Sequence, residues 1–280
     1  TTAAAVLFNN SSEKLVLSVE GGGISHNSAP QGTVLQTTKA CKATFKGVTM
    51  DHNTATSGNG AVANNAAAEL TFSGCTISNN SSSGNGAVIY ASGGSVKADS
   101  TLFLSNTAGT TSGNGAVLYC YKYVSGKLYF TNCRFISNKG AKNGAIICLS
   151  SSTEGRVFAM NNCLFYGNTG NNSTGGRTIN ASSHNLIILN STLIDSCMNS
   201  IIGTGVPSTY GFNYCLIANN IVSNEVTNGY SFDVRSADYR IKTNGYNQYS
   251  AINNSSLSDY YSMSRSEEHT SELQSHHDLV

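Results

Sequence analysis

Ser57-Gly58-Asn59-Gly60-Ala61-Val62 is the stretch that decides the fold, because the chain repeats it. The same six residues return unchanged at Ser83–Val88 and Ser112–Val117, an eroded copy follows at Lys142–Ile146, and Gly175–Ile179 is a candidate fifth copy. Self-similarity with a period of roughly 20–50 residues is typical of solenoids, propellers and arrays. The chain is therefore expected to stack copies of one structural unit.

A second six-residue element alternates with the first, and it ends in Asn in most copies. The copies are Val48–Asn53, Cys75–Asn80, Thr101–Asn106, Cys133–Asn138, Cys163–Asn168, the divergent Thr192–Cys197, and Cys215–Asn220. The gaps between their last positions range from 23 residues (197 to 220) to 32 residues (106 to 138). Repetition at uneven spacing predicts a constant core joined by loops of variable length.

Each copy of this second element is predicted to be a strand, since its residues alternate with a period of two. Cys133, Phe135 and Ser137 fall on one face of the expected strand. Arg134 and Ile136 fall on the other face.

Two further strands per repeat are expected, one at Gly-Ala-Val and one near residues 95–98. No interval contains a convincing amphipathic helix, and a propeller blade would take ~40–45 residues per repeat. The predicted fold class is therefore all-β: a right-handed, single-stranded parallel β-helix of about seven to nine turns.

Equivalent residues of successive turns lie ~4.8 Å apart in such a coil, so sequence equivalences become physical columns. Phe103, Phe135 and Phe165 are expected to stack inside it. The Asn positions are expected to form a ladder at one corner, where Asn tolerates the left-handed conformation and pairs along the stack. Glycines of the repeat supply the positive φ of a sharp turn. The ladder residues are Asn53, Asn80, Asn106, Asn138, Asn168 and Asn220, and the glycines are Gly60, Gly86, Gly115 and Gly144.

The paired Gly-Ala-[Val/Ile] and [Phe/Ile/Met]-x-x-Asn motifs resemble the polymorphic outer-membrane protein repeats of chlamydial autotransporter passengers, and similar repeats in surface proteins of trichomonad protists. The resemblance covers roughly residues 20–220. It implies an extracellular or cell-surface location, with host-cell surface glycans or proteins as partners. Two features depart from the pattern: Asn-Gly-Ala stands where Gly-Gly-Ala is usual, and Cys197 stands where Asn is expected.

The repeats assign residues 1–225 to the β-helix, with an incomplete N-terminus, and residues 226–264 to an atypical final turn or capping region. The cap contains the charge-dense run Asp233–Lys242, and charges at an exposed solenoid end oppose pairing with other chains. Residues 266–280 resemble a translated sequencing adapter, so they are expected to be an artefactual tail, disordered or forming a short helix, beyond which the natural chain continued. Without Arg265 and this tail the basic residues fall from 16 to 15 and the acidic residues from 15 to 11. That charge is too dilute for a nucleic-acid footprint.

Motifs for cofactors and metals have structural explanations here. Gly58–Ala63 fits a dinucleotide fingerprint, but that fingerprint needs a helix after it, and the repeat predicts none. No C-x-x-C pair exists, which argues against a zinc cluster. Cys75, Cys133, Cys163 and Cys215 share the inward strand position, where free buried thiols are expected. Adjacent turns would also bring Cys133 and Cys163 within bridging distance.

The candidate catalytic side chains are not expected to lie close to one another. A glycosidase needs two carboxylates separated by ~5–9.5 Å, and the aligned pair Asp51 and Asp195 is expected ~24 Å apart. His26, His52 and His184 are singletons. Arg240-Ile241-Lys242 resembles one element of polygalacturonases, but the other motifs of that family are absent. The sequence nominates no catalytic, cofactor-binding or metal-binding residue.

The expected function is that of a non-catalytic secreted or cell-surface β-helix repeat protein, adhesin-like or part of a passenger or stalk. The alternative is a fragment of a polysaccharide lyase or glycoside hydrolase of the pectate-lyase-like β-helix class. No apolar run reaches the ~18 residues of a membrane span. Neither nucleic acid nor a cofactor is expected as a partner, and the chain is expected to be a monomer.

Overall fold

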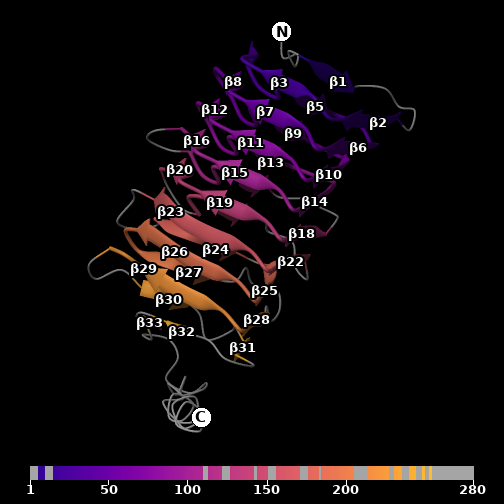
Figure 1. The fold of residues 1–280 in the computed structure, drawn as a ribbon. Coiled ribbons are helices and arrows are strands. Elements are labelled where there is room, and N and C mark those ends of the chain that lie inside the picture. The colour runs from indigo at the N-terminus through magenta and orange to yellow at the C-terminus, as the bar shows by residue number, and fades with distance from the viewer. Residues whose placement is uncertain are drawn as a thin grey trace, which may run out of the picture.

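The computed structural model describes residues 6–9, 15–109, 113–121, 127–141, 144–150, 156–170, 176–182, 184–204, 214–226, 230–234, 240–243, 248–249 and 252–253. Within these ranges every regular element is a β-strand, and the strands pair in parallel with their equivalents one turn away. The chain forms a parallel β-helix, as predicted (Figure 1). The adapter-like segment 266–280 lies outside the described residues.

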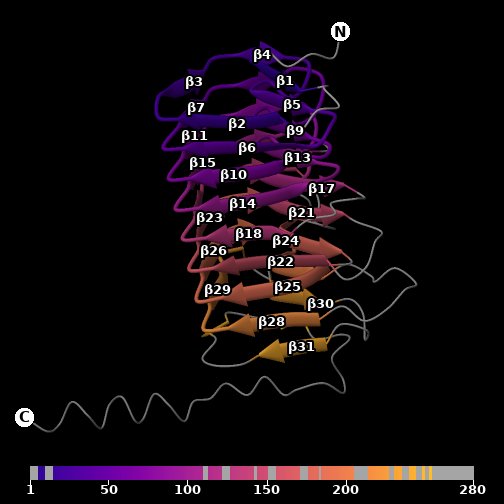
Figure 2. The same ribbon diagram turned by 90° about the vertical axis from the view of Figure 1, so that its right-hand side faces the viewer.

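Three parallel sheets make up the wall of the coil. The first sheet contains β1 (Leu7–Asn9), β5 (Leu35–Thr37), β9 (Ala63–Asn65), β13 (Ile89–Ala91), β17 (Leu118–Tyr121), β21 (Ile147–Ser150), β24 (Arg177–Ser182), β27 (Ser200–Thr204), β30 (Tyr230–Val234) and β33 (Ile252–Asn253). The second sheet contains β2 (Leu15–Glu20), β6 (Cys41–Lys46), β10 (Glu69–Ser73), β14 (Ser95–Asp99), β18 (Leu128–Thr131), β22 (Arg156–Asn161), β25 (His184–Leu189), β28 (Tyr214–Ala218) and β31 (Arg240–Thr243) (Figure 2).

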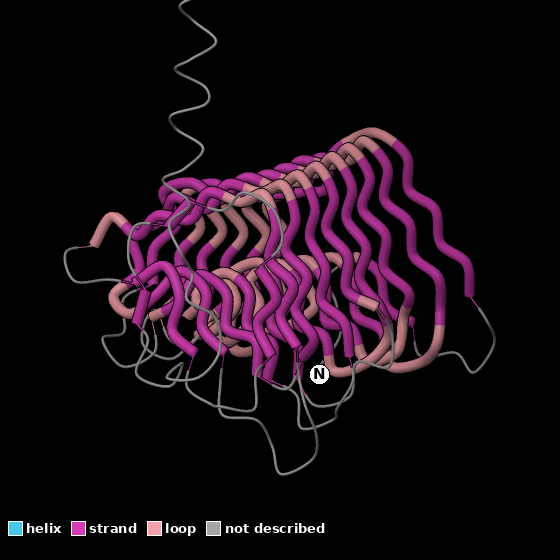
Figure 3. The backbone as a smooth tube through the Cα atoms, turned by 90° about the horizontal axis from the view of Figure 1, so that it is seen from below, coloured by secondary structure: helices cyan, strands magenta, loops and turns pink. Residues whose placement is uncertain are grey.

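The third sheet is bent, because each early turn contributes two short strands to it. They are β3 (Gly23–Ser25), β4 (Ser28–Ala29), β7 (Thr49–Asp51), β8 (Thr54–Ala55), β11 (Thr76–Ser78), β12 (Ser81–Ser82), β15 (Leu102–Leu104), β16 (Thr107–Ala108), β19 (Arg134–Ile136) and β20 (Lys139–Gly140). Later turns contribute one strand each: β23 (Leu164–Gly170), β26 (Thr192–Cys197), β29 (Ile221–Asn224) and β32 (Gln248–Tyr249). Seen along the coil in Figure 3, the strands of successive turns lie in line.

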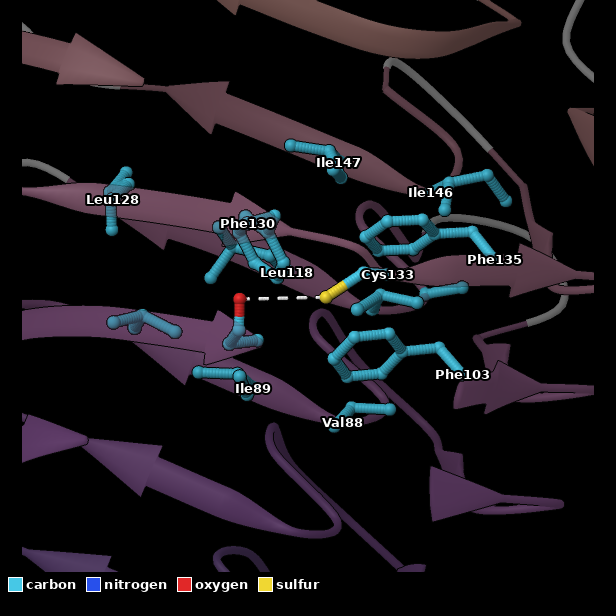
Figure 4. Close-up of a cluster of buried hydrophobic side chains, with 14 of the residues drawn as sticks. Val88, Ile89, Phe103, Leu118, Leu128, Phe130, Cys133, Phe135, Ile146 and Ile147 are labelled. Atoms are coloured by element: carbon cyan, nitrogen blue, oxygen red, sulfur yellow. Dashed lines mark hydrogen bonds between the residues drawn. The ribbon is translucent and has the colours of Figure 1, made fainter. Parts of the chain in front are cut away.

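The core is a column of side chains that runs along the inside of the coil. Phe103, Phe135 and Phe165 are in register on β15, β19 and β23, and they have no exposed area. The ring centroids of Phe103 and Phe135 are 5.0 Å apart, and those of Phe135 and Phe165 are 4.1 Å apart. Figure 4 shows Val88, the residue directly before β13, beside the ring of Phe103. Full burial of a Phe side chain contributes about 1.5–3 kcal/mol to folding, so this column is a main source of stability.

The strand predicted at Gly-Ala-Val begins directly after that motif, three residues later than its Gly. In the first three copies, β9, β13 and β17 start at Ala63, Ile89 and Leu118, directly after the Val. The Gly before Ala-Val has a positive φ, +62° at Gly86 and Gly115, so the chain is still turning there. The strand can form only after that turn is complete.

The prediction that the ladder Asn itself takes the left-handed conformation is wrong. That conformation belongs to the residue before each internal ladder Asn. These residues are His26, His52, Asn79, Ser105 and Ser137, with φ between 53° and 56°, and Gly167, with φ of 63°. Ser137 is exposed and does not share the inward face of Phe135. The left-handed residue turns the chain between the two short strands, and this turn carries the following Asn side chain into the coil.

The predicted alignment is also wrong from residue 192 onward. Asp195, which accepts a hydrogen bond from Nδ2 of Asn168, takes the ladder position that was expected for Cys197. Cys215 pairs with Leu186 in the second sheet, so it does not share the strand position of Cys163. Asn220 lies at the other tight corner, where its Oδ1 accepts a hydrogen bond from the backbone N–H of Ser191. Both corners begin with a left-handed residue, and Asn219-Asn220 therefore looks like Asn79-Asn80 in the sequence.

The coil continues past Asn220 into the region that was predicted to be atypical. Strands β30, β31, β32 and β33 extend all three sheets in parallel as far as Asn253. The two ends of the charge-dense run lie on β30 and β31, and residues 235–239 are outside the described ranges.

Candidate functional site

The corner Asn side chains form a ladder inside the coil. The backbone N–H and Nδ2 of Asn106 both donate to Oδ1 of Asn138, each at 3.0 Å, and Nδ2 also donates to the carbonyl of Ile77 at 2.9 Å. The same pattern connects Asn27, Asn53, Asn80, Asn106, Asn138 and Asn168. All but the first have no exposed area. These amides are held by structural hydrogen bonds and cannot reach a ligand.

The repeated glycines occupy positions that exclude a side chain. Gly60, Gly86, Gly115 and Gly144 have φ of +68°, +62°, +62° and +57°. A Cβ on Gly86 would lie 2.3 Å from the carbonyl oxygen of Ile89. The motif therefore repeats because the chain needs both the left-handed backbone and the empty space before each first-sheet strand.

Two further Asn ladders run on the outside of the coil, and the sequence did not predict them. Nδ2 of Asn132 donates to Asp99, and Nδ2 of Asn162 donates to Asn132, at 3.0 and 2.8 Å. In the Gly-Asn-Gly motif, the backbone N–H of Asn85 donates to Asn59, and that of Asn114 donates to Asn85, at 2.7 and 2.8 Å. Most surface Asn residues of these turns therefore also serve the fold.

The outer face of the first sheet carries a different set of side chains. Because Ile89 and Ala91 are buried on either side of Tyr90, Tyr90 points away from the core. The strand register continues its position as one outward column, which consists of Gln36, Asn64, Tyr90, Tyr119, Cys148, Asn180 and Gly203. We call this column, together with Tyr121, the first-sheet face.

Three nearly parallel tyrosine rings form the centre of the first-sheet face. The ring centroids of Tyr90 and Tyr119 are 5.6 Å apart, and Tyr121 lies 6.3 Å from each of them. Tyr121 exposes 37% of its surface, Tyr90 is half-buried and Tyr119 exposes 9%. Burial, with a smaller contribution from Cys148, raises the pKa of Tyr119 to about 12, and burial also raises the pKa of Tyr90. Both hydroxyls remain protonated at physiological pH and can donate hydrogen bonds.

Polar uncharged groups lie on both sides of the tyrosines. Asn64 is one turn before Tyr90 and half-buried, and Cys148 is one turn after Tyr119. Burial raises the pKa of the Cys148 thiol to about 12, while a hydrogen bond from Asn180 and the charge of Arg177 oppose this rise. The thiol is therefore neutral and does not provide a reactive nucleophile at physiological pH.

The first sheet is also the least charged wall of the coil in this region. Strands β5, β9, β13, β17 and β21 contain no Asp, Glu, Lys or Arg. Over the same turns the strands of the second sheet contain charged residues, among them Lys42, Lys46, Glu69, Lys97 and Asp99. The first-sheet face therefore suits a neutral ligand rather than an ionic one.

The structure differs from the sequence-based expectation for two of the histidines. His26 and His52 are not singletons, since their rings stack 4.8 Å apart, and Nδ1 of His52 lies 2.8 Å from Asp51. Asp195 and His184 have no exposed area. Among the described residues, no three His, Cys, Asp or Glu side chains gather as a metal site, and no helix has the length and hydropathy of a membrane span.

The described cysteines are free thiols in the structure: Cys41, Cys75, Cys120, Cys133, Cys148, Cys163 and Cys197. Sγ of Cys133 donates to the carbonyls of Thr131 and Ala98, at 3.2 and 3.5 Å. A hydrogen bond with the neighbouring Cys163 and, second, burial raise the pKa of Cys133, so this thiol packs as a small neutral group.

The tyrosines were missed at the sequence level, although a signal was present. Tyr90 and Tyr119 each lie two residues after the Val of a Gly-Ala-Val copy, in Val88-Ile89-Tyr90 and Val117-Leu118-Tyr119. Placing the strand directly after the Val, three residues later, would have put both rings in one outward column. Comparison of the chain with models of known protein families, with curated proteins and with solved structures found no match.

Proposed function

We propose that the chain is a non-catalytic, secreted or cell-surface β-helix protein, adhesin-like or part of a passenger or stalk, that binds uncharged glycans on its first-sheet face. The observation that carries this proposal is the cluster of Tyr90, Tyr119 and Tyr121 on the part of the first sheet, from β5 to β21, whose strands contain no charged side chains. The rest of the described coil supports it, because the buried amides and thiols serve the fold.

The chemistry of the first-sheet face matches a saccharide. Aromatic rings carry negative charge on their faces, which attracts the weakly positive C–H groups of a sugar ring. The tyrosine hydroxyls and the Asn64 amide offer both donors and acceptors, and sugar hydroxyls need both. Successive turns repeat these groups every ~4.8 Å, which is close to the length of one pyranose ring. Asn64 and Tyr90 on adjacent turns, with Tyr121 beside them, are the accessible groups of this face, whereas Gln36, Cys148 and Asn180 are buried. A short neutral saccharide lying along the coil axis would therefore contact these three residues.

A direct test measures binding of neutral and acidic oligosaccharides to the purified chain by calorimetry. Tyr121→Ala removes the most exposed ring and is expected to weaken binding of neutral oligosaccharides at least tenfold. Tyr129→Ala is the matched control, because Tyr129 is a half-buried tyrosine on the outer side of the second sheet. It is expected to leave binding unchanged.

Three outcomes would contradict the proposal. They are equal losses in both variants, binding of acidic saccharides or a proline-rich peptide instead of neutral saccharides, and turnover of a glycan by the intact chain. Turnover would favour the lyase or hydrolase alternative. Labelling of intact cells with an antibody to the chain tests the surface location separately.

A further inference from the structure

The internal Asn ladder ends in a carboxyl group. The backbone N–H and Nδ2 of Asn168 donate to Oδ1 of Asp195 at 2.9 and 2.8 Å, so Asp195 takes the place of the next amide. Its other oxygen, Oδ2, accepts a hydrogen bond from Oγ1 of Thr178 at 2.9 Å. Oγ1 of Thr178 also lies 3.2 Å from Sγ of Cys197. All four residues have no exposed area, and we call them the Asp195 cluster.

The shape of the coil changes at the same position. Every earlier ladder residue follows a left-handed residue, whereas Ile194, which precedes Asp195, is not among the described residues with positive φ. Strand β26 therefore runs straight from Thr192 to Cys197 and alternates regularly, with Leu193, Asp195 and Cys197 pointing inward. The bend of the third sheet is lost, and a carboxyl group enters the interior where the earlier turns have an amide.

The Asp195 carboxyl has hydrogen-bond donors but no positively charged group among those that shift its pKa. Strand β23 provides Asn168 and strand β24 provides Thr178, both uncharged. Its own strand provides the buried Cys197 thiol, and the turn after β29 provides Glu225, a second acid. Arg177, which directly precedes Thr178 in the sequence, is also buried. Its charge lowers the pKa of Cys148 on the first-sheet face.

Burial raises the pKa of Asp195 to about 7, and Glu225 adds to the rise, while the hydrogen bonds from Asn168 and Thr178 oppose it. The structure can also accommodate the added proton. The protonated Oδ2 donates to Oγ1 of Thr178, whose hydroxyl turns to donate to Sγ of Cys197. Every polar atom of the cluster then keeps a partner, and no charge is buried.

We propose that the Asp195 cluster is a proton-sensitive joint of the coil. When Asp195 is protonated, strand β26 is held firmly to β23 and β24. When Asp195 is ionised, the buried charge favours local opening, and the strands from β26 onward separate before the rest of the coil. The folded joint binds the proton more tightly than the opened joint, whose Asp195 carboxyl has its ordinary pKa of 3.8. By linkage, the stability of the folded joint therefore falls as the pH rises. The joint is therefore firmest in acid and loosens as the pH rises through the folded pKa.

Amide hydrogen exchange at a series of pH values between 5 and 8, corrected for the intrinsic rate, tests this proposal. In the intact chain, the opening equilibrium of amides in β26 and β29 is expected to rise by up to tenfold per pH unit between pH 5 and 7. Amides in β10 and β11, several turns away, are expected to show no such dependence. A flat profile in β26 and β29 would overturn the proposal.

Two variants separate the joint from a general effect of pH. Asp195→Asn restores the amide of the ladder and is expected to abolish the pH dependence in β26 and β29. Asp99→Asn changes an exposed acid that is hydrogen-bonded to Asn132. It is expected to leave the pH dependence in β26 and β29 unchanged. An Asp195→Asn chain with the same pH dependence as the unmodified chain would rule the joint out.

Direct titration provides a readout that does not depend on the folding of Asp195→Asn. Carbon NMR of the aspartate carboxyl groups in the unmodified chain is expected to show a transition near pH 7 for Asp195. Thr178→Val removes a hydrogen bond that lowers this pKa, so it is expected to move the transition to higher pH. A transition near pH 4, or one that Thr178→Val does not move, would count against the proposed joint.

Discussion

Asn106 shows how a single side chain can serve three turns of the coil. It donates to Asn138 and to the carbonyl of Ile77, and its Oδ1 accepts two hydrogen bonds from Asn80. Since none of these atoms reaches water, each one depends on its partner, and a buried donor or acceptor left unsatisfied costs about 1–3 kcal/mol.

Asn106→Ala is accordingly expected to lower the free energy of unfolding by about 3–6 kcal/mol, because it leaves several buried groups without partners. Urea denaturation at constant pH measures the change. The control is Asn132→Ala on the exposed ladder, where water replaces the lost hydrogen bonds, and it is expected to cost only the backbone strain of Ala at φ of +55°, about 1–2 kcal/mol. Equal effects at the two positions would show that burial is not what makes the internal ladder stabilising.

Two left-handed glycines allow backbone strain and space to be measured separately. Gly74 has φ of +60° and no atom within 4 Å of the position that a Cβ would occupy, whereas Gly86 has φ of +62° and a carbonyl oxygen at 2.3 Å. Gly74→Ala is expected to cost about 1–2 kcal/mol from backbone strain alone. Gly86→Ala is expected to cost about 1–3 kcal/mol more, because the chain must also shift to relieve the clash. Thermal unfolding of both variants measures this difference in cost. Similar melting temperatures would show that the clash at Gly86 adds nothing to the backbone strain.

At the scale of elements, the early repeats predicted the strand columns well. Between residues 48 and 168 every copy of the Asn-terminated element keeps the same length from strand to corner, and the length differences fall in the connections. The alignment of Phe103, Phe135 and Phe165 needs only this constant length. The left-handed residue could not be located in the same way, because His, Asn, Ser and Gly all fill that position.

The later turns could not be aligned from the sequence for a physical reason. The coil has two kinds of tight corner, and both place a left-handed residue before a side chain that caps the neighbouring turn. A pair such as Asn219-Asn220 satisfies either corner, so the motif alone does not distinguish them. The ladder position of Asp195 could not be recognised from the sequence for a different reason. Strand β26 has no corner, and its sequence no longer contains the motif.

The candidate site was less predictable than the fold. A tyrosine on a strand can point inward or outward, and a shift of one residue in the strand start reverses the answer. The sequence placed the first-sheet strand at Gly-Ala-Val itself, which left the outward position of Tyr90 and Tyr119 unassigned. Their clustering with Tyr121 becomes visible only when the register between β13 and β17 is known.

For the whole molecule, the main consequence of the coil is that each turn packs chiefly on its two neighbours. The stability of such a protein is roughly a sum of repeat terms and interface terms, and folding can spread from any turn. Surface charge pairs add little to this sum: Lys46 and Glu20 form a 2.6 Å ion pair, but both are exposed. The core column and the ladders therefore determine whether the coil unfolds as one unit or in blocks.

Phe135→Ala tests whether the interfaces between neighbouring turns determine how the coil unfolds. Phe135 stacks between Phe103 and Phe165 in the middle of the column, and its removal is expected to cost about 3–5 kcal/mol. Because the loss weakens one interface between neighbouring turns, calorimetry is expected to show the single unfolding transition splitting into two, one for the turns before β19 and one for those after it. Val19→Ala, a smaller change in the first turns where β2 pairs with β6, is expected to leave one transition. A single transition shifted to lower temperature in Phe135→Ala would show instead that the coil is cooperative over its whole length.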